Sequence, residues 1–177
     1  MDFGRLLTAM VTPFDDELRV DWQRTGELID YLIERQASDG LVIAGTTGES
    51  PTLTDEEKLE LFSFAVKRAN GRAKIIAGTG SNDTAHSIHL TKEAEKLGVD
   101  GIMLVAPYYS RTSQAGLIAH FNAIAAATEL PVMIYNIPSR TGVNVETNTM
   151  LELAKTENIV AVKESSGDLD QMSAILA

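Results

Sequence analysis

The sequence predicts an α/β fold of the (β/α)8 barrel class, with about six βα units in its 177 residues. Short apolar runs rich in Val and Ile alternate with amphipathic stretches, and they restart roughly every 30 residues, the length of one βαβ unit. The runs are continuously apolar, which is typical of parallel strands buried on both faces. We therefore expect strands at 6–11, 41–44, 74–77, 101–105, 131–135 and 159–162.

The amphipathic stretches predict helices between these strands. Thr54 and Glu57 have the spacing of a capping box, in which Thr54 accepts from the third backbone N–H and Glu57 reaches back. Gly71 is expected to follow the end of that helix, and another helix is expected to begin at Asp83 and close near Gly98. The apolar face of the first of these helices is expected to consist of Leu59, Phe62, Ala65 and Val66.

Consecutive βα units can form either an open doubly wound sheet or a barrel. No G-x-G-x-x-G motif follows the first run, which weakens the case for a dinucleotide-binding fold. Polar residues gather after several different strands, which favours a barrel whose single site is fed by many loops. Because a closed barrel needs eight units and about 250 residues, residues 1–177 are expected to form a partial barrel catalytic domain.

The amino-acid composition disfavours several classes of binding partner. The net charge of -10 disfavours nucleic acid and anionic membranes as partners. Cysteine is absent, which removes disulfides and thiolate metal sites, and the sequence begins without the basic start and apolar core of a signal peptide. No apolar run approaches the ~18 residues of a membrane span. We expect a cytoplasmic protein.

Lys163 is the candidate nucleophile. A lysine at a strand end is commonly a solvated surface charge, but Lys163 follows the wholly apolar run 159–162, so its stem is expected to be buried. Desolvation lowers the pKa of a lysine, and a neutral amine can attack a carbonyl carbon. Lys163 is therefore expected to form an imine with a keto acid.

Tyr135 ends the preceding strand and is the candidate proton shuttle, since a phenol at that position can relay protons. The alternative is a half-buried tyrosine bonded to backbone. Tyr108 and Tyr109 follow the strand that is expected at 101–105. Paired tyrosines more often serve packing or a subunit interface.

Two loops carry candidate carboxylate-binding groups. Residues 45–50 read Gly-Thr-Thr-Gly-Glu-Ser, where the glycines permit a tight turn and the hydroxyls of Thr46 and Thr47 can donate to a carboxylate. Arg140 offers a fork for a second carboxylate, although a surface ion pair is an alternative role. The histidines are expected to be structural, because none has metal-ligand spacing with Asp or Glu: His86, His89 and His120.

Together these residues resemble the dihydrodipicolinate synthase family, of the N-acetylneuraminate lyase superfamily. The resemblance covers essentially the whole chain, in the family's order and spacing. Its motifs are Gly45-Thr46-Thr47-Gly48-Glu49-Ser50, Ala77-Gly78-Thr79-Gly80, Ala106-Pro107-Tyr108-Tyr109, Tyr135-Asn136-Ile137-Pro138-Ser139-Arg140-Thr141-Gly142 and Val162-Lys163-Glu164.

The resemblance implies an enzyme of lysine and diaminopimelate biosynthesis that condenses pyruvate with L-aspartate-4-semialdehyde to 4-hydroxy-tetrahydrodipicolinate. It implies that Lys163 forms the pyruvyl imine, that Tyr135 relays protons with Thr47 and Tyr109, and that Arg140 binds the semialdehyde carboxylate. It assigns the pyruvate carboxylate to Thr46, Thr47 and Gly48. No metal or other cofactor is implied, because the imine is the electron sink.

The family also implies self-association as a homodimer or homotetramer, with Tyr109 donated to a neighbouring subunit. Family members continue through two further barrel strands and a C-terminal helical segment. Two alternatives stay open. One is a sister lyase that acts on a keto-deoxy sugar acid such as N-acetylneuraminate. The Thr46-Thr47 pair and Arg140 favour the synthase over this lyase. The other is a catalytically inactive, self-associating barrel fragment.

Overall fold

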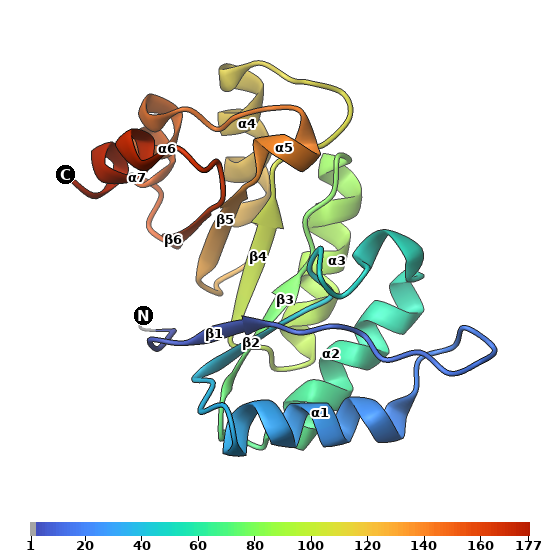
Figure 1. The fold of residues 1–177 in the computed structure, drawn as a ribbon. Coiled ribbons are helices and arrows are strands. Elements are labelled where there is room, and N and C mark those ends of the chain that lie inside the picture. Colours follow the sequence, from blue (N-terminus) through green and yellow to red (C-terminus); the bar gives the residue numbers. More distant parts are fainter. Residues whose placement is uncertain (1–2) are drawn as a thin grey trace. The chain divides into compact units, whose positions relative to one another are not determined.

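The computed structural model describes residues 3–177 and contains the six predicted strands, separated by helices (Figure 1). The strands lie within one or two residues of the predicted runs, except that the first is shorter. In chain order the elements are β1 Leu7–Ala9, α1 Trp22–Glu34, β2 Gly40–Ile43, a 3-10 helix Ser50–Thr52, α2 Asp55–Ala69, β3 Lys74–Gly78, α3 Thr84–Lys96, β4 Gly101–Val105, α4 Gln114–Ala125, β5 Val132–Asn136, α5 Pro138–Thr141, α6 Thr147–Leu153, β6 Ile159–Glu164 and α7 Leu169–Leu176.

The chain forms two compact units, Met1–Gly78 with Glu93–Gly101, and Thr79–Lys92 with Ile102–Ala177. In the first, β1, β2 and β3 pair in parallel and in sequence order, and in the second β4, β5 and β6 do the same. Over residues 3–177, neither unit shows the reversal of strand order that marks a doubly wound sheet. The predicted class, a (β/α)8 type with six βα units, is confirmed.

The core of the first unit lies between its strands and the helices α1 and α2. Figure 1 shows α1 and α2 side by side, and α2 contacts β2 and β3. Burying one large aliphatic or aromatic side chain contributes about 1.5–3 kcal/mol relative to leaving it exposed. The side chains that are almost completely buried here are Ile29, Leu41, Ile43, Leu61, Phe62, Ile75 and Ile76.

Helix α2 begins as the sequence predicts. The Thr54 side chain accepts from Glu57 N at 3.2 Å, and the Glu57 carboxylate accepts from Thr54 N at 2.8 Å, which completes the capping box. The helix ends at Asn70, whose backbone is left-handed, with Gly71 directly after it.

The predicted apolar face of α2 is partly wrong. Phe62 and Ala65 are buried as predicted, but Leu59 and Val66 are only half-buried. The buried stripe runs instead through Lys58 and Leu61. Lys58 can lie there because its aliphatic stem packs while its amine pairs with Asp55 at 3.5 Å.

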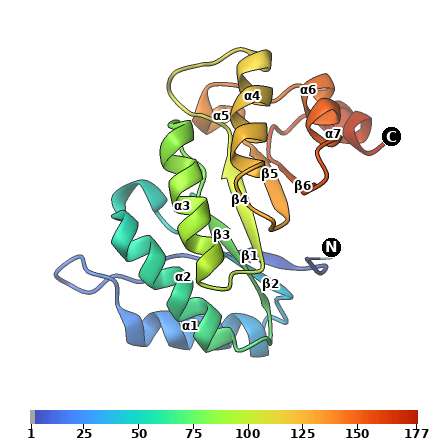
Figure 2. The ribbon, with the colours of Figure 1, turned by 180° about the vertical axis from the view of Figure 1, so that it is seen from behind.

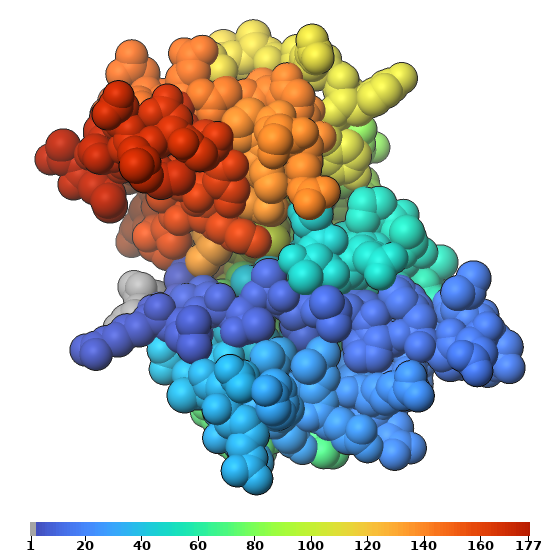
Figure 3. Space-filling view, in the orientation of Figure 1, coloured from blue at the N-terminus to red at the C-terminus, as the bar shows by residue number. Residues whose placement is uncertain are grey.

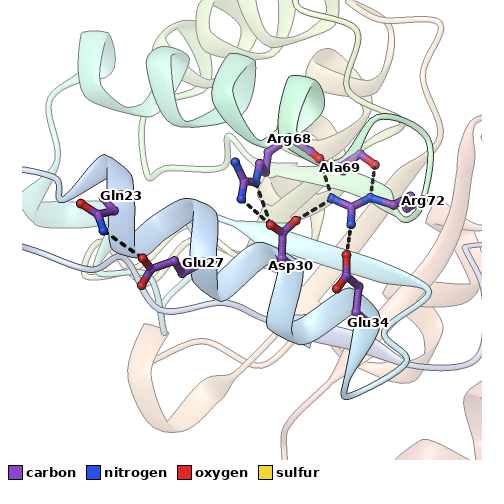
Figure 4. Close-up of polar contacts among 7 residues, drawn as sticks. All are labelled: Gln23, Glu27, Asp30, Glu34, Arg68, Ala69 and Arg72. Carbon is purple, nitrogen blue, oxygen red and sulfur yellow. Dashed lines mark hydrogen bonds and ion pairs between the residues drawn. The ribbon is translucent and has the colours of Figure 1, made fainter.

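A charged cluster joins the outer sides of α1 and α2 (Figure 4). The Asp30 carboxylate accepts from both Arg68 and Arg72, and Arg72 also pairs with Glu34 at 2.6 Å. Hydrogen bonds from Arg68, the larger contribution, and from Arg72 hold the pKa of Asp30 below its usual value. Arg72 also donates to the carbonyls of Ala69 and Arg68 at the end of α2. Such a shared network fixes the two helices together more firmly than an isolated surface pair would.

In the second unit α4 packs on α6, and α6 on α7, as Figure 2 shows from behind. Leu117, Phe121 and Ile124 of α4 are completely buried. The C-terminal elements are less enclosed: α7 has no buried residue, and its red atoms lie on the surface in Figure 3. β1 is likewise only half-buried, and it appears as a blue band on the visible surface of its own unit.

β5 and β6 run further than the predicted runs. β5 includes Asn136 and β6 includes Glu164, because these polar residues still pair across the ladder. Tyr135 and Lys163 therefore lie one residue inside the carboxyl ends of their strands.

Candidate functional site

The structure brings the two principal candidates, Tyr135 and Lys163, together in the second unit. They are paired residues of the parallel strands β5 and β6, so their side chains share one face. The Lys163 amine lies over the Tyr135 ring, with its Nζ 4.1 Å from the ring centroid. Tyr135 is 4% exposed, so the alternative of a half-buried tyrosine is wrong.

The surroundings of Lys163 favour its neutral form. Burial lowers the pKa of Lys163 below that of an ordinary lysine. A lowered pKa increases the fraction of amine that can attack a carbonyl near neutral pH. Lys163 is only partly buried, so the predicted burial of its stem is met in part, and the alternative of a fully solvated surface charge is not seen.

Glu164, the next residue along β6, is held by a polar cluster that sequence reasoning missed. Its carboxylate oxygens accept from Asn136 Nδ2 at 3.1 and 3.0 Å, from Ser166 N at 2.8 Å and from Gln171 Nε2 at 3.1 Å. Asn144 joins the cluster by accepting from Asn136 Nδ2 at 2.8 Å. The only signal in the sequence was the position of Glu164 beside Lys163 at the end of an apolar run.

Thr46, Thr47 and Gly48 lie in the first unit, in the turn that follows β2. Thr46 and Thr47 are exposed, whereas Gly48 is buried. The turn is closed by Gly48 N donating to Gly45 O at 3.1 Å and by Glu49 N donating to Thr46 O at 3.1 Å. The two hydroxyls are thus carried on a hydrogen-bonded turn and remain accessible to a ligand.

The tight turn expected of residues 45–48 is present, and its glycines do not supply left-handed backbone. The left-handed residues are Ala44 and Glu49, with φ of 52° and 56°, while Gly45 and Gly48 have no positive φ. Space is tight at Gly48, because a Cβ there would lie 3.0 Å from Met10 O and 3.2 Å from Thr12 Oγ1. Thr12 Oγ1 also donates to Gly48 O at 2.7 Å.

Arg140 and Tyr109 lie on exposed loops of the second unit. Arg140 belongs to α5, is exposed, and forms no ion pair within residues 3–177, so the alternative of a surface ion pair is not seen. Tyr109 is 90% exposed and has a left-handed φ of 74°. Its backbone N–H donates to Thr141 O at 3.2 Å, which ties this loop to α5.

The candidate residues thus fall into two groups, one in each unit. Tyr135, Lys163, Arg140 and Tyr109 belong to the second unit, and the turn at 46–48 belongs to the first.

The three histidines all lie in helices, His86 and His89 in α3 and His120 in α4. His120 is buried, with its Nδ1 2.8 Å from Thr84 Oγ1, and burial lowers its pKa. Nδ1 of His86 is 3.1 Å from Ser81 Oγ. In the described part of the chain no group of three or more His, Cys, Asp or Glu side chains is arranged to hold a metal ion. No helix among residues 3–177 is long and apolar enough to span a membrane.

Comparisons with known proteins agree with these observations. Residues 2–177 match the model of the dihydrodipicolinate synthetase family. A 4-hydroxy-tetrahydrodipicolinate synthase from Moorella thermoacetica is 61% identical over 176 residues, which are 99% of this chain and 60% of that protein. The chain spans about 60% of the length of the curated relatives that it matches.

Solved structures of the same family have the same fold over this chain. A crystal structure of a dihydrodipicolinate synthase from Bacillus anthracis has a TM-score of 0.97 and 50% identity, and the match covers 99% of this chain and 60% of that one. A dihydrodipicolinate synthase from Acinetobacter baumannii, solved in complex with pyruvate, has a TM-score of 0.96 and 41% identity, with the same coverage.

Proposed function

Because the chain belongs to the dihydrodipicolinate synthetase family, we propose that it acts as a pyruvate-dependent Schiff-base lyase. The reaction is the condensation of pyruvate with L-aspartate-4-semialdehyde to 4-hydroxy-tetrahydrodipicolinate, a step of lysine and diaminopimelate biosynthesis in the cytoplasm. The observation that carries the proposal is the partly buried Lys163 amine, with its lowered pKa, lying over the Tyr135 ring.

In this proposal the neutral Lys163 amine attacks the keto carbon of pyruvate, and the carbinolamine loses water to give an imine. The imine withdraws electrons, so a proton can leave the pyruvyl methyl group, and the resulting enamine carbon attacks the aldehyde. The chemistry needs no metal or other cofactor. The complex of the Acinetobacter baumannii relative with pyruvate supports this choice of substrate.

The remaining roles follow the family pattern. Tyr135 relays protons, together with Thr47 and with Tyr109 of a neighbouring subunit. The pyruvate carboxylate is held by donors at the turn of Thr46, Thr47 and Gly48, whose accessible hydroxyls support this assignment. Arg140 binds the carboxylate of the semialdehyde, a role for which an exposed guanidinium without an ion-pair partner in the described chain is suited.

The first test is covalent trapping. Treating the 177-residue chain with pyruvate and borohydride is expected to add one pyruvyl group at Lys163, located by peptide mass spectrometry. Because burial lowers the pKa of Lys163, labelling should begin at a lower pH than for an ordinary lysine, whose pKa is about 10.4. Lys163→Met should abolish the label, whereas Lys155→Met, which changes an exposed lysine paired with Glu152, should not.

Labelling at another lysine, with Lys163 untouched, would refute the mechanism. If the 177-residue chain takes no label, a hybrid that continues with the C-terminal part of the Moorella thermoacetica relative decides between two explanations. A labelled hybrid would identify the 177-residue chain as an inactive barrel fragment, and an unlabelled hybrid would reject the proposed chemistry.

Self-association is the second expectation. Tyr109 exposes a large aromatic side chain on left-handed backbone, a conformation that costs a non-glycine residue about 1–3 kcal/mol and is concentrated at functional sites. Among residues 3–177, β6 pairs only with β5, and an open strand edge is a template for pairing with another chain. We expect the chain to sediment as a dimer or larger, and Tyr109→Ala to weaken that association.

Tyr31→Ala is the matched control, because Tyr31 is also an exposed tyrosine but lies on α1. Sedimentation of the unaltered chain as a single monomeric species at high concentration would contradict the expectation. It would also leave Tyr109 without a catalytic role.

A further inference from the structure

The pairing of β5 with β6 contains one irregularity. Val132 pairs with Ile159, but the next residue of β5, Met133, pairs with Ala161. Val160 is therefore an extra residue of β6 with no partner on β5. An extra residue of this kind is a β-bulge, a feature that often re-aims a side chain beside an active site.

The bulge decides which residue of β6 lies beside Tyr135. A regular ladder continuing from the Val132 pair would set Tyr135 opposite Val162, whereas the observed pairing sets it opposite Lys163. Since a slip of one residue moves every side chain of a strand to the other face, the regular ladder would turn Lys163 away from Tyr135. The contact between the amine and the ring depends on the bulged register.

Glu164 distinguishes the two registers. In the bulged register it pairs with Asn136, which is completely buried and donates to both of its carboxylate oxygens. In the regular register Asn136 would face Lys163, and Glu164 would come opposite Ile137, whose side chain offers no donor. Because buried polar groups are costly when unpaired, only the bulged register satisfies this pair.

The other contacts of Glu164 strengthen this selection. Ser166 N binds one carboxylate oxygen at 2.8 Å, and Gln171 of α7 binds the other at 3.1 Å. Burial by itself raises the pKa of Glu164, but hydrogen bonds from Asn136, Ser166 and Gln171 together lower it below its usual value. The carboxylate is thus ionised near neutral pH and joins the end of β6 to β5 and α7.

We infer that Glu164 is the positioning residue of this site, and that its carboxylate holds β6 in the bulged register that places the Lys163 amine over Tyr135. Successive residues of a strand face opposite sides, so Glu164 lies away from the reacting face and acts through the backbone. The inference deepens the proposed function and rests on Lys163 as the nucleophile and Tyr135 as its neighbour.

Glu164→Gln tests it in the 177-residue chain. The substitution replaces one accepting oxygen with an amide group that opposes the donors of Asn136 and Gln171. In the unaltered chain the Tyr135 ring should shift the NMR signals of the Lys163 ε-methylene protons upfield. Glu164→Gln is expected to abolish that shift and to slow pyruvate trapping about 10–100-fold, since small misplacements of reacting groups carry costs of this size.

Glu157→Gln is the matched control, because it removes the same charge from an exposed residue just before β6, and it should retain both properties. A folded Glu164→Gln variant that keeps the upfield shift would overturn the inference. If this variant does not fold, Gln171→Leu removes the α7 donor to Glu164 together with the hydrogen bonds of Gln171 to Asn144 and Val145, and an unchanged shift there would overturn the inference equally. Absence of trapping in an unaltered chain that shows the shift would count against the proposed function, while the NMR comparison would still decide the role of Glu164.

Discussion

Removing the Tyr135 hydroxyl is expected to slow proton loss from bound pyruvate by about 10²–10⁴-fold, the usual contribution of a positioned acid–base group. The physical reason is that enamine formation requires a proton to leave the pyruvyl methyl group. Tyr135→Phe keeps the aromatic ring, so the Lys163 amine can still lie over it and remain partly buried. Imine formation and pyruvate affinity should therefore change far less than proton transfer.

Proton NMR in D2O measures this step directly, as the exchange of pyruvate methyl hydrogen for deuterium catalysed by the protein. The concentration dependence of borohydride trapping gives the pyruvate affinity of the same variant. Tyr31→Phe serves as the control. Among the described residues, the exposed hydroxyl of Tyr31 is hydrogen-bonded only by Gln36 Nε2, at 2.8 Å. An unchanged exchange rate in Tyr135→Phe would remove this phenol from the mechanism.

The second large effect is expected at Gly78, the last residue of β3. A Cβ there would lie 2.5 Å from Ala44 O and 2.9 Å from Ala44 C, which are backbone atoms directly after β2. Forcing an extra methyl group into a closely packed interior typically costs about 1–3 kcal/mol. Gly78→Ala should therefore lower the free energy of unfolding by about that amount, measured by urea denaturation.

The contrast with another glycine makes this prediction specific. Gly26, within α1, has side-chain atoms no closer than 3.4 Å to its Cβ position, the nearest being Phe64 Cζ. Because glycine disfavours a helix by about 1 kcal/mol relative to alanine, Gly26→Ala should be neutral or stabilising. Equal destabilisation by both substitutions would show that backbone crowding at Gly78 is not the cause.

Local patterns in the sequence predicted much of this structure. The capping box at Thr54 and Glu57 depends on residues three apart, and the strands depend on short apolar runs, so both could be recognised without knowledge of distant contacts. The placement of Tyr135 and Lys163 near the carboxyl ends of neighbouring strands followed from the same reasoning.

The register of β6 could not be predicted in this way. Ile159 to Val162 are all apolar, so a slip of one residue leaves the hydrophobic pattern unchanged and the sequence favours neither register. The deciding pair, Asn136 and Glu164, is 28 residues apart and becomes visible only when the strands are paired. The crowding at Gly48 could not be predicted for a related reason, because it comes from the distant backbone of Met10.

Val160 is the residue that makes the bulge. Its side chain is 42% exposed and the residue has no partner on β5, so many other side chains would serve equally well there. Losing the residue would remove the bulge, because Ile159 and Ala161 would become consecutive partners of Val132 and Met133, and Lys163 would stay opposite Tyr135. For the pairing of Lys163 with Tyr135, this position is therefore free both in composition and in length, and the strand would read the same active-site pair with or without it.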